Sequence, residues 1–193
     1  MAVVELKNAV FTAVDFETTG SVPGWPNEPW QIGLYRFSTA AGAAAGECLS
    51  SYLLVSRERP FNRFAPGRHA SRRDELAAAP SMADVWEDVS PWLRGRAIVA
   101  HNSGTERTIL RKAAPLDRLG PWIDTLAIAR RALPGRESYA LEDIIPDLGL
   151  EEAVRRIAPP EAAPHDALYD AIACGELLRF FVAAGITCCE AAT

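Results

Sequence analysis

The clearest hydrophobic pattern along the chain is a short apolar run that ends in two acids. Residues 10–14 are apolar or β-branched throughout, which is typical of a central strand covered on both faces. Because side chains alternate along a strand, Asp15 and Glu17 project to the same face at its carboxyl end, before Gly20 ends the pattern. Two adjacent carboxylates repel, so the pair predicts a compensating positive charge such as a divalent metal ion. The alternative is an acid pair at a solvated strand end.

Two further strands follow, separated by segments rich in turn-forming residues. Residues 21–29 contain three prolines and a glycine, which together predict a loop beside the two acids. Residues 30–37 and 47–55 are typical of strands, and the small residues of 40–46 join them. The order predicts an antiparallel meander.

The second half of the chain alternates helical periodicity with short apolar strands. A helix is predicted after Ser81, which with Asp84 resembles a capping box, and a bend is predicted near Pro91. The further predicted elements are a strand at 97–100, a helix to about 113, a strand at 122–125 leading into a helix to 131, a helix at 140–148, a turn or two at 151–157 and a long helix at 167–184. Asp124 or Thr125 is expected to cap its helix.

Two more acids occupy helical stripes that otherwise carry apolar residues. Glu106 shares a helix face with Ile109, Leu110 and Ala113. Asp170 heads a stripe that continues through the following residues: Ala173, Cys174, Leu177 and Phe181.

A histidine precedes the second of these acids. Prolines at 159, 160 and 164 keep the approach to His165 out of a helix, so the side chain must reach the same region from a mobile loop. A surface histidine on a proline-rich loop is the alternative.

Composition and charge limit the classes of protein that fit. The 193 residues suit a single domain over 1–193, and the net charge of -5 argues against a broad basic surface that coats duplex nucleic acid. Four cysteines without a C-x-x-C pair indicate neither a disulfide framework nor a zinc site. The N-terminus lacks a signal-peptide pattern and no apolar run reaches membrane-spanning length, so we expect a cytoplasmic protein without a membrane partner.

Positive charge is concentrated in one segment. Residues 57–73 carry six arginines against one acid, Glu58, in a chain that is acidic overall. We expect this segment, with Arg68, Arg72 and Arg73, to contact a polyanion locally. A solvated irregular connection is the alternative.

The four acids predict a chemistry when they are taken together. Asp15, Glu17, Glu106 and Asp170 are expected to converge at one edge of a mixed sheet. Two divalent cations about 3.5–4 Å apart would neutralise them and would form the usual apparatus for in-line displacement at phosphorus. Phosphodiester hydrolysis is therefore the expected reaction class.

An ordered set of motifs resembles the DEDDh 3′-to-5′ exonucleases of the ribonuclease H-like superfamily, which include the proofreading subunit of the bacterial replicative polymerase. The resemblance spans roughly residues 9–182, the last few residues being a short tail. The matching segments are Asp15-Phe16-Glu17-Thr18-Thr19-Gly20, Gln31-Ile32-Gly33, His101-Asn102, Asp124-Thr125-Leu126 with Ala129-Arg130, and His165 with Asp170-Ala171.

The resemblance implies a fold and a catalytic apparatus. The fold would be α/β, with a mixed five-stranded sheet flanked by helices. Two ions of Mg²⁺ or Mn²⁺ would be held by Asp15, Glu17, Glu106 and Asp170, and His165 would act as general base on the attacking water. The product would be a nucleoside 5′-monophosphate.

The resemblance also implies substrate contacts and partners. Thr18 and Thr19 would hold the terminal nucleotide, and Asn102 would lie beside it. The substrate would be the 3′ end of single-stranded DNA or RNA, and a polymerase or repair complex would be a further partner. The choices between DNA and RNA, and between a monomer and a homodimer, stay open at the level of sequence.

One departure from the family pattern supports a different reading, and a third reading stays open beside it. The second motif normally ends in Phe-Asp, whereas this chain has Thr105 and Glu106, so the fourth ligand is a glutamate. That replacement supports an alternative in which the domain has lost catalysis and serves as a binding or interaction module. An endonuclease or other phosphoesterase is disfavoured by the spacing of His165 and Asp170 and by the turn at 18–20.

Overall fold

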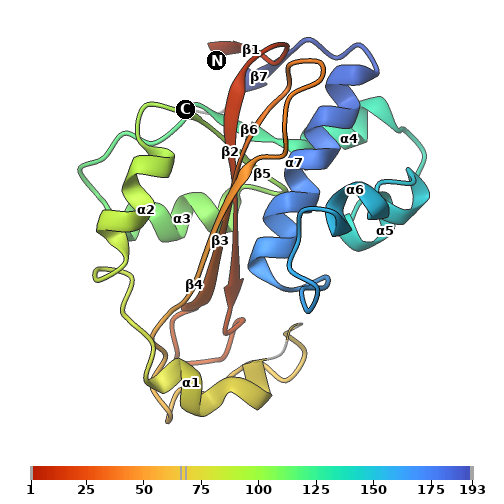
Figure 1. Cartoon of the computed structure of the whole chain (residues 1–193). Coiled ribbons are helices and arrows are strands. Elements are labelled where there is room, and N and C mark those ends of the chain that lie inside the picture. Colours follow the sequence, from red (N-terminus) through yellow and green to blue (C-terminus); the bar gives the residue numbers. More distant parts are fainter. Residues whose placement is uncertain (1, 66, 68, 192–193) are drawn as a thin grey trace.

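A mixed five-stranded sheet forms the centre of the molecule, whose computed structural model describes residues 2–65, 67 and 69–191 (Figure 1). The strands are β2 (Val10–Thr18), β3 (Pro29–Ser38), β4 (Glu47–Tyr52), β5 (Ala97–Ala100) and β6 (Trp122–Asp124). Their order is β4-β3-β2-β5-β6, with β4, β3 and β2 antiparallel and with β2, β5 and β6 parallel. The predicted meander and mixed sheet are confirmed.

Helices cover both faces of this sheet. They are α1 (Arg73–Ala77), α2 (Trp86–Leu93), α3 (Gly104–Ala113), α4 (Thr125–Ala132), α5 (Leu141–Asp147), α6 (Glu151–Arg155) and α7 (Ala167–Ala183), with a 3₁₀ turn η1 at His69–Arg72. In Figure 1, α7 lies on one face with α4, α5 and α6 beside it, and α2 and α3 lie on the other. None of the helices found in the described part of the chain has both the length and the apolar character needed to span a membrane.

The alternation of side chains on β2 creates two cores. Phe11 and Ala13 pack into the core that includes α7, whereas Val14 and Phe16 pack into the core that includes α2 and α3. These residues are almost fully buried, so both faces of β2 are covered from Phe11 to Val14, whereas Val10 at the start of the strand is exposed. The strand can therefore hold its carboxyl end in a fixed position.

Two predicted elements have different boundaries. The strand predicted at 47–55 ends at Tyr52, because the amides of Leu54 and Val55 donate to the carbonyls of Pro80 and Leu76 instead of β3. The helix predicted after Ser81 begins only at Trp86.

The predicted capping box closes a turn ahead of that helix. Ser81 N donates to Asp84 Oδ2 at 2.9 Å, and Asp84 N donates to Ser81 Oγ at 3.3 Å. The residue that precedes α2 is Val85, which offers no side-chain cap. On the predicted stripe of α3, Ala113 is exposed because the helix ends there.

The two ends of the chain pair in a way that the sequence pattern did not indicate. Strands β1 (Ala2–Glu5) and β7 (Cys188–Ala191) form a separate antiparallel pair. Each is only four residues long, which is too short for a clear alternation of polar and apolar positions. The segment predicted as a short tail is therefore tied to the N-terminal strand.

Candidate active site

The first two acids extend the row of side chains that β2 turns toward α7. Asp15 and Glu17 follow Phe11 and Ala13 at intervals of two, and they lie opposite Gly33 and Gln31 of β3. Glu17 is 7% exposed although it is a carboxylate. The predicted position at the carboxyl end of a central strand is confirmed.

Gly33 allows the first turn of α7 to lie directly on the sheet. A Cβ at this position would lie 2.2 Å from the carbonyl carbon and oxygen of Ala167, closer than real Cβ atoms come to any neighbour. Gln31 adds polar contacts, because its Nε2 donates to Asp166 Oδ2 at 3.0 Å and its Oε1 accepts from Ala167 N at 3.3 Å. Asp166 also caps α7 by accepting from Leu168 N at 3.1 Å. The start of α7 is thus held beside the acids of β2.

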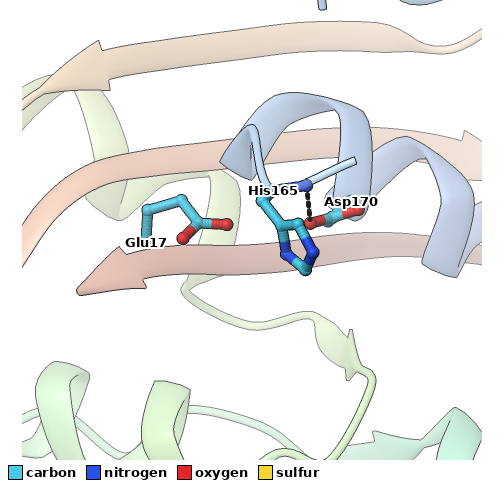
Figure 2. A group of neighbouring side chains, drawn as sticks. All are labelled: Glu17, His165 and Asp170. Atoms are coloured by element: carbon cyan, nitrogen blue, oxygen red, sulfur yellow. Dashed lines mark hydrogen bonds between the residues drawn. The ribbon is translucent and has the colours of Figure 1, made fainter. Parts of the chain in front are cut away.

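His165 and Asp170 enter the site from this start of α7. Asp170 Oδ2 accepts a hydrogen bond from His165 N at 3.0 Å, and one potential ligand atom from each of Glu17, His165 and Asp170 lies within 4.8 Å of the others (Figure 2). His165 lies in the loop before the helix, as predicted, with φ at 65°. Its ring Nε2 lies 2.9 Å from Glu142 Oε2 of α5, so the loop has a defined partner.

Glu106 enters from the first turn of α3 and is 5% exposed. Among the described residues its Oε2 has no hydrogen-bond partner. The turn before α3 is held by Asp124, whose carboxylate accepts from Asn102 N and Ser103 N, each at 3.0 Å. Asp124 also accepts from Leu126 N at 2.9 Å, which confirms the predicted cap. Asn102 itself is exposed, with φ at 66°.

The four acids share one electrostatic environment. Burial, followed by repulsion from Asp170, Glu106, Glu17 and Asp166, raises the pKa of Asp15 well above its usual range. Burial and the charge of Asp170 raise the pKa of Glu17 to about 8. Burial raises the pKa of Glu106 and of Asp170 to about 7 each. All four predicted acids therefore lie close enough to influence one another's ionisation.

These residues fit divalent cations of the hard, oxygen-preferring kind. Carboxylates with raised pKa values are destabilised in their charged form, and a cation would remove that cost. The buried, unpartnered Oε2 of Glu106 is the most specific sign, because a buried carboxylate oxygen normally has a partner. Asp15, Glu17, Asp170 and Glu106 are the residues that would hold the ions.

The raised pKa values predict how stability depends on pH in the metal-free protein. From about pH 4.5 to pH 8 the carboxyl of Glu17 binds more protons in the folded state than in the unfolded chain, because its folded-state pKa is about 8 against an ordinary 4.5. The free energy of unfolding should therefore fall as the pH rises through this window. Thermal unfolding in a chelator should give a lower Tm at pH 8 than at pH 5, and Mn²⁺ should raise Tm more at pH 8.

Glu17→Gln is the matched control for this measurement. This variant lacks the carboxyl whose pKa is raised to about 8, so its Tm should fall less steeply as the pH rises. Contributions of other groups, such as His101, to the pH dependence of Tm are common to both proteins. If Tm fell with pH equally steeply in the wild type and in Glu17→Gln, the clustering of negative charge around Glu17 would be contradicted.

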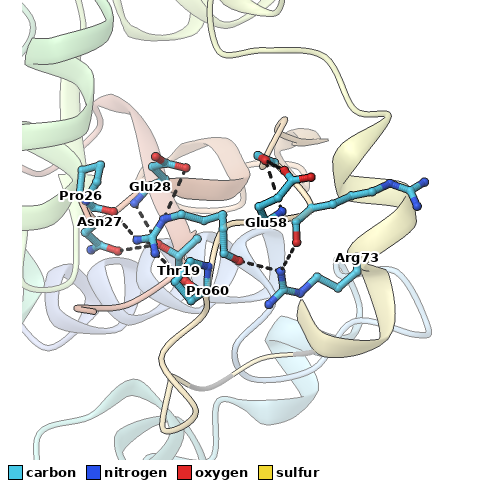
Figure 3. A network of polar contacts seen from close by, with 10 residues as sticks. Thr19, Pro26, Asn27, Glu28, Glu58, Pro60 and Arg73 are labelled. Atoms are coloured by element: carbon cyan, nitrogen blue, oxygen red, sulfur yellow. Dashed lines mark hydrogen bonds and ion pairs between the residues drawn. The ribbon is translucent and has the colours of Figure 1, made fainter. Parts of the chain in front are cut away.

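Thr19 supports the turn after β2 from inside the protein. It is fully buried, and its hydroxyl accepts from Arg59 Nη2 at 2.9 Å and from Glu28 N at 3.1 Å. Arg59, which is 1% exposed, also donates to Pro26 O, so it joins the two loops that flank the turn (Figure 3). The hydroxyl of Thr19 therefore supports the turn, and the predicted contact of this residue with a terminal nucleotide stays a prediction. Thr18 is the partly exposed threonine of the pair.

The arginine-rich segment is used largely within the protein. Arg73 Nη1 donates to Arg59 O at 2.6 Å and to Arg57 O at 3.1 Å, contacts that Figure 3 shows beside Pro60. Arg57 pairs with Asp74 at 2.9 Å. Several arginines of this segment therefore bind other parts of the protein. Arg68 lies outside the described residues.

Arg72 lies closer to the predicted site. It pairs with Glu75 at 2.9 Å, and its guanidinium carbon lies 4.8 Å from the ring centroid of Tyr52. Arg72 and Tyr52 line a pocket of about 320 Å³ that also includes His165 and Asp166. Of the two described arginines predicted to bind substrate, Arg72 is the one that borders the histidine loop.

Three residues of the site were not predicted. Asp166 could have been recognised as the cap of a strongly apolar helix, because it stands directly before that helix. Arg59 and Glu142 give no local signal, since their partners Thr19 and His165 are 40 and 23 positions away.

Similarity to known proteins covers most of the chain. The family model described as Exonuclease, RNase_T, matches residues 12–178. A DNA polymerase III subunit epsilon-like protein of Rhodobacter capsulatus is 29% identical over 97% of this chain, which spans 26% of that protein. The DNA polymerase III subunit epsilon of Treponema pallidum is 27% identical over 92% of this chain and 78% of its own length. A PolC-type DNA polymerase III of Thermotoga petrophila is 32% identical over 75% of this chain, which spans 10% of that protein.

Solved structures share the same fold. The nuclease domain of 3′hExo, a DEDDh family member bound to rAMP, superposes with a TM-score of 0.73 at 15% identity, over 98% of this chain and 100% of that one. Exonuclease X in complex with 5′ overhanging duplex DNA superposes with a TM-score of 0.65 at 24% identity, over 91% of this chain and 92% of that one.

Proposed function

Because the chain belongs to the exonuclease family, we propose that it removes nucleotides one at a time from the 3′ ends of single-stranded nucleic acid. The predicted exonuclease family is confirmed, and the predicted fold is shared with the nuclease domain of a DEDDh family member. The acid of the second motif is here Glu106. Hydrolysis of the terminal phosphodiester bond would release a nucleoside 5′-monophosphate.

The observation that carries the proposal is the meeting of four acids and a histidine at the carboxyl end of β2. Burial, followed by repulsion from neighbouring acids, destabilises the anionic form of Asp15. Glu106 presents a buried oxygen that has no hydrogen-bond partner among the described residues. Two ions of Mg²⁺ or Mn²⁺ would supply charge stabilisation at phosphorus and at the attacking and leaving oxygens. An acid cluster of this kind has no evident structural purpose without cations.

The chain's own residues hold and move the reacting groups. His165 takes a proton from the attacking water as general base, and its place beside Glu17 and Asp170 supports this role. Asp170 fixes the backbone of His165 through the amide hydrogen bond of 3.0 Å. Thr18, which follows Glu17 at the end of β2, and Asn102, in the turn before α3, are the residues proposed to contact the terminal nucleotide.

The proposed substrate is a short single-stranded segment. A net charge of -5 disfavours binding of a long nucleic-acid strand by charge alone, so the protein contacts only a few nucleotides. Arg72, which lines a pocket with His165, is the arginine proposed to contact them. We include both DNA and RNA in the substrate class. A polymerase or repair complex is the proposed protein partner, because two relatives are named for the epsilon subunit of DNA polymerase III.

A labelled-oligonucleotide assay tests this function. DNA and RNA strands labelled at the 5′ end are incubated with Mg²⁺ or Mn²⁺, with chelator, and with the Asp15→Asn variant as a protein control. A ladder that shortens from the 3′ end, stops with chelator and is absent for Asp15→Asn is expected. Internal cuts would identify an endonuclease. Binding without shortening would support the module that has lost catalysis.

A further inference from the structure

The imidazole of the proposed base has a carboxylate partner on a different helix. Glu142 Oε2 lies 2.9 Å from His165 Nε2, and Glu142 stands in the first turn of α5. The helix is anchored by its neighbours Ile144 and Ile145, which are buried in the same core as α7. The partner is therefore presented by a packed element rather than by a flexible loop.

This contact assigns separate tasks to the two ring nitrogens. An ionised carboxylate only accepts hydrogen bonds, so a neutral imidazole bonded to it through Nε2 carries its hydrogen on that atom. Nδ1 is then the nitrogen with the free lone pair. A base whose tautomer is fixed by a carboxylate can accept a proton at the other nitrogen, and the carboxylate stabilises the imidazolium that forms.

The backbone of His165 is held from a second direction. Its φ of 65° lies in the left-handed region, which residues other than glycine seldom occupy. The hydrogen bond of 3.0 Å from His165 N to Asp170 Oδ2 fixes the main chain, and the contact of 2.9 Å between Nε2 and Glu142 Oε2 fixes the ring. Together they select one conformation in a loop that approaches through prolines at 159, 160 and 164.

We propose that Glu142 is a positioning residue for the reaction, acting through His165 by setting the tautomer and direction of its ring. The proposal rests on the proposed function, because it assumes that His165 is the base. Glu142 touches neither metal ligand nor substrate in this scheme. The opposite possibility is that Glu142 holds the ring in a resting position that catalysis must leave, and the two make opposite predictions for turnover.

Steady-state kinetics on a 5′-labelled oligonucleotide separate these outcomes. Glu142→Gln and Glu142→Ala should lower kcat by about 10- to 100-fold with KM nearly unchanged, the range found for residues that orient a catalytic ligand. Glu142→Asp should recover part of the loss. Asp143→Asn is the matched control, since it removes an exposed acid from the next position of α5 and should behave as wild type.

A spectroscopic measurement tests the orientation without relying on turnover. When the imidazole of His165 is neutral, nitrogen NMR should show its hydrogen on Nε2 in the wild-type protein. The same measurement on Glu142→Ala should show a mixture of the two tautomers. An unchanged or raised kcat in Glu142→Ala, or an unchanged tautomer, would overturn the proposal while leaving exonuclease activity of the wild type in place. A wild-type protein without activity would instead remove the proposed function, and the catalytic role of Glu142 with it.

Discussion

Replacing His165 by alanine is expected to lower turnover by about 10²- to 10⁴-fold, the usual contribution of a positioned general base. The loss should fall on kcat, because the acids proposed to hold the metal ions remain and because the amide of residue 165 can still donate to Asp170. The fold should survive, since the side chain of His165 is 36% exposed and lies outside the cores. Single-turnover rates under saturating enzyme, with oligonucleotide affinity measured in parallel, check this expectation.

Chemical rescue gives this prediction a sharper form. Imidazole added to His165→Ala should restore part of the rate if the missing group is a base, whereas it should have no effect on Asp15→Asn. A His165→Ala protein that cleaves at the wild-type rate would return His165 to the role of a surface histidine on a proline-rich loop.

The parts of the site that the sequence predicted are those set by local periodicity. Asp15 and Glu17 follow from strand alternation, and Glu106 follows from a helical stripe, because in both cases the backbone alone fixes the direction of the side chain. The cap formed by Asp124 is equally local. The confirmed antiparallel meander rests on the same kind of evidence, whereas the mixed five-stranded sheet was implied by the family resemblance and its strand order was not predicted.

The parts that were not predicted depend on contacts between distant segments. Thr19 is buried because Arg59 returns from 40 positions away, and no pattern around the threonine announces that partner. The close approach at Gly33 depends on the path of α7, which begins more than 130 residues later. The pairing of β1 with β7 joins the two ends of the chain. Tertiary packing decides these features, and single-sequence periodicity carries no record of it.

Replacing Glu106 by glutamine is expected to reduce exonuclease activity at least about 10²-fold, on the scale of removing one transition-state stabilising group. The amide keeps the shape of the side chain but cannot supply the negative charge that a cation needs. Glu106→Asp should keep measurable activity, because a shift of the side chain or of α3 can absorb one methylene. Mn²⁺ should support this variant better than Mg²⁺, whose octahedral geometry is more demanding.

Stability gives Glu106→Gln a readout that does not depend on catalysis. The pKa of Glu106 is raised to about 7 in the folded protein against an ordinary 4.5, so above pH 7 its ionised form opposes folding when no metal is bound. Glutamine cannot ionise, and the metal-free Tm of Glu106→Gln at pH 8 should therefore equal or exceed that of the wild type, while the rise in Tm on adding Mn²⁺ should be smaller. Glu87→Gln, which changes an exposed acid on α2, should alter neither quantity. Activity equal to wild type in Glu106→Gln, with an undiminished response to Mn²⁺, would show that the fourth carboxylate takes no part in holding the ions.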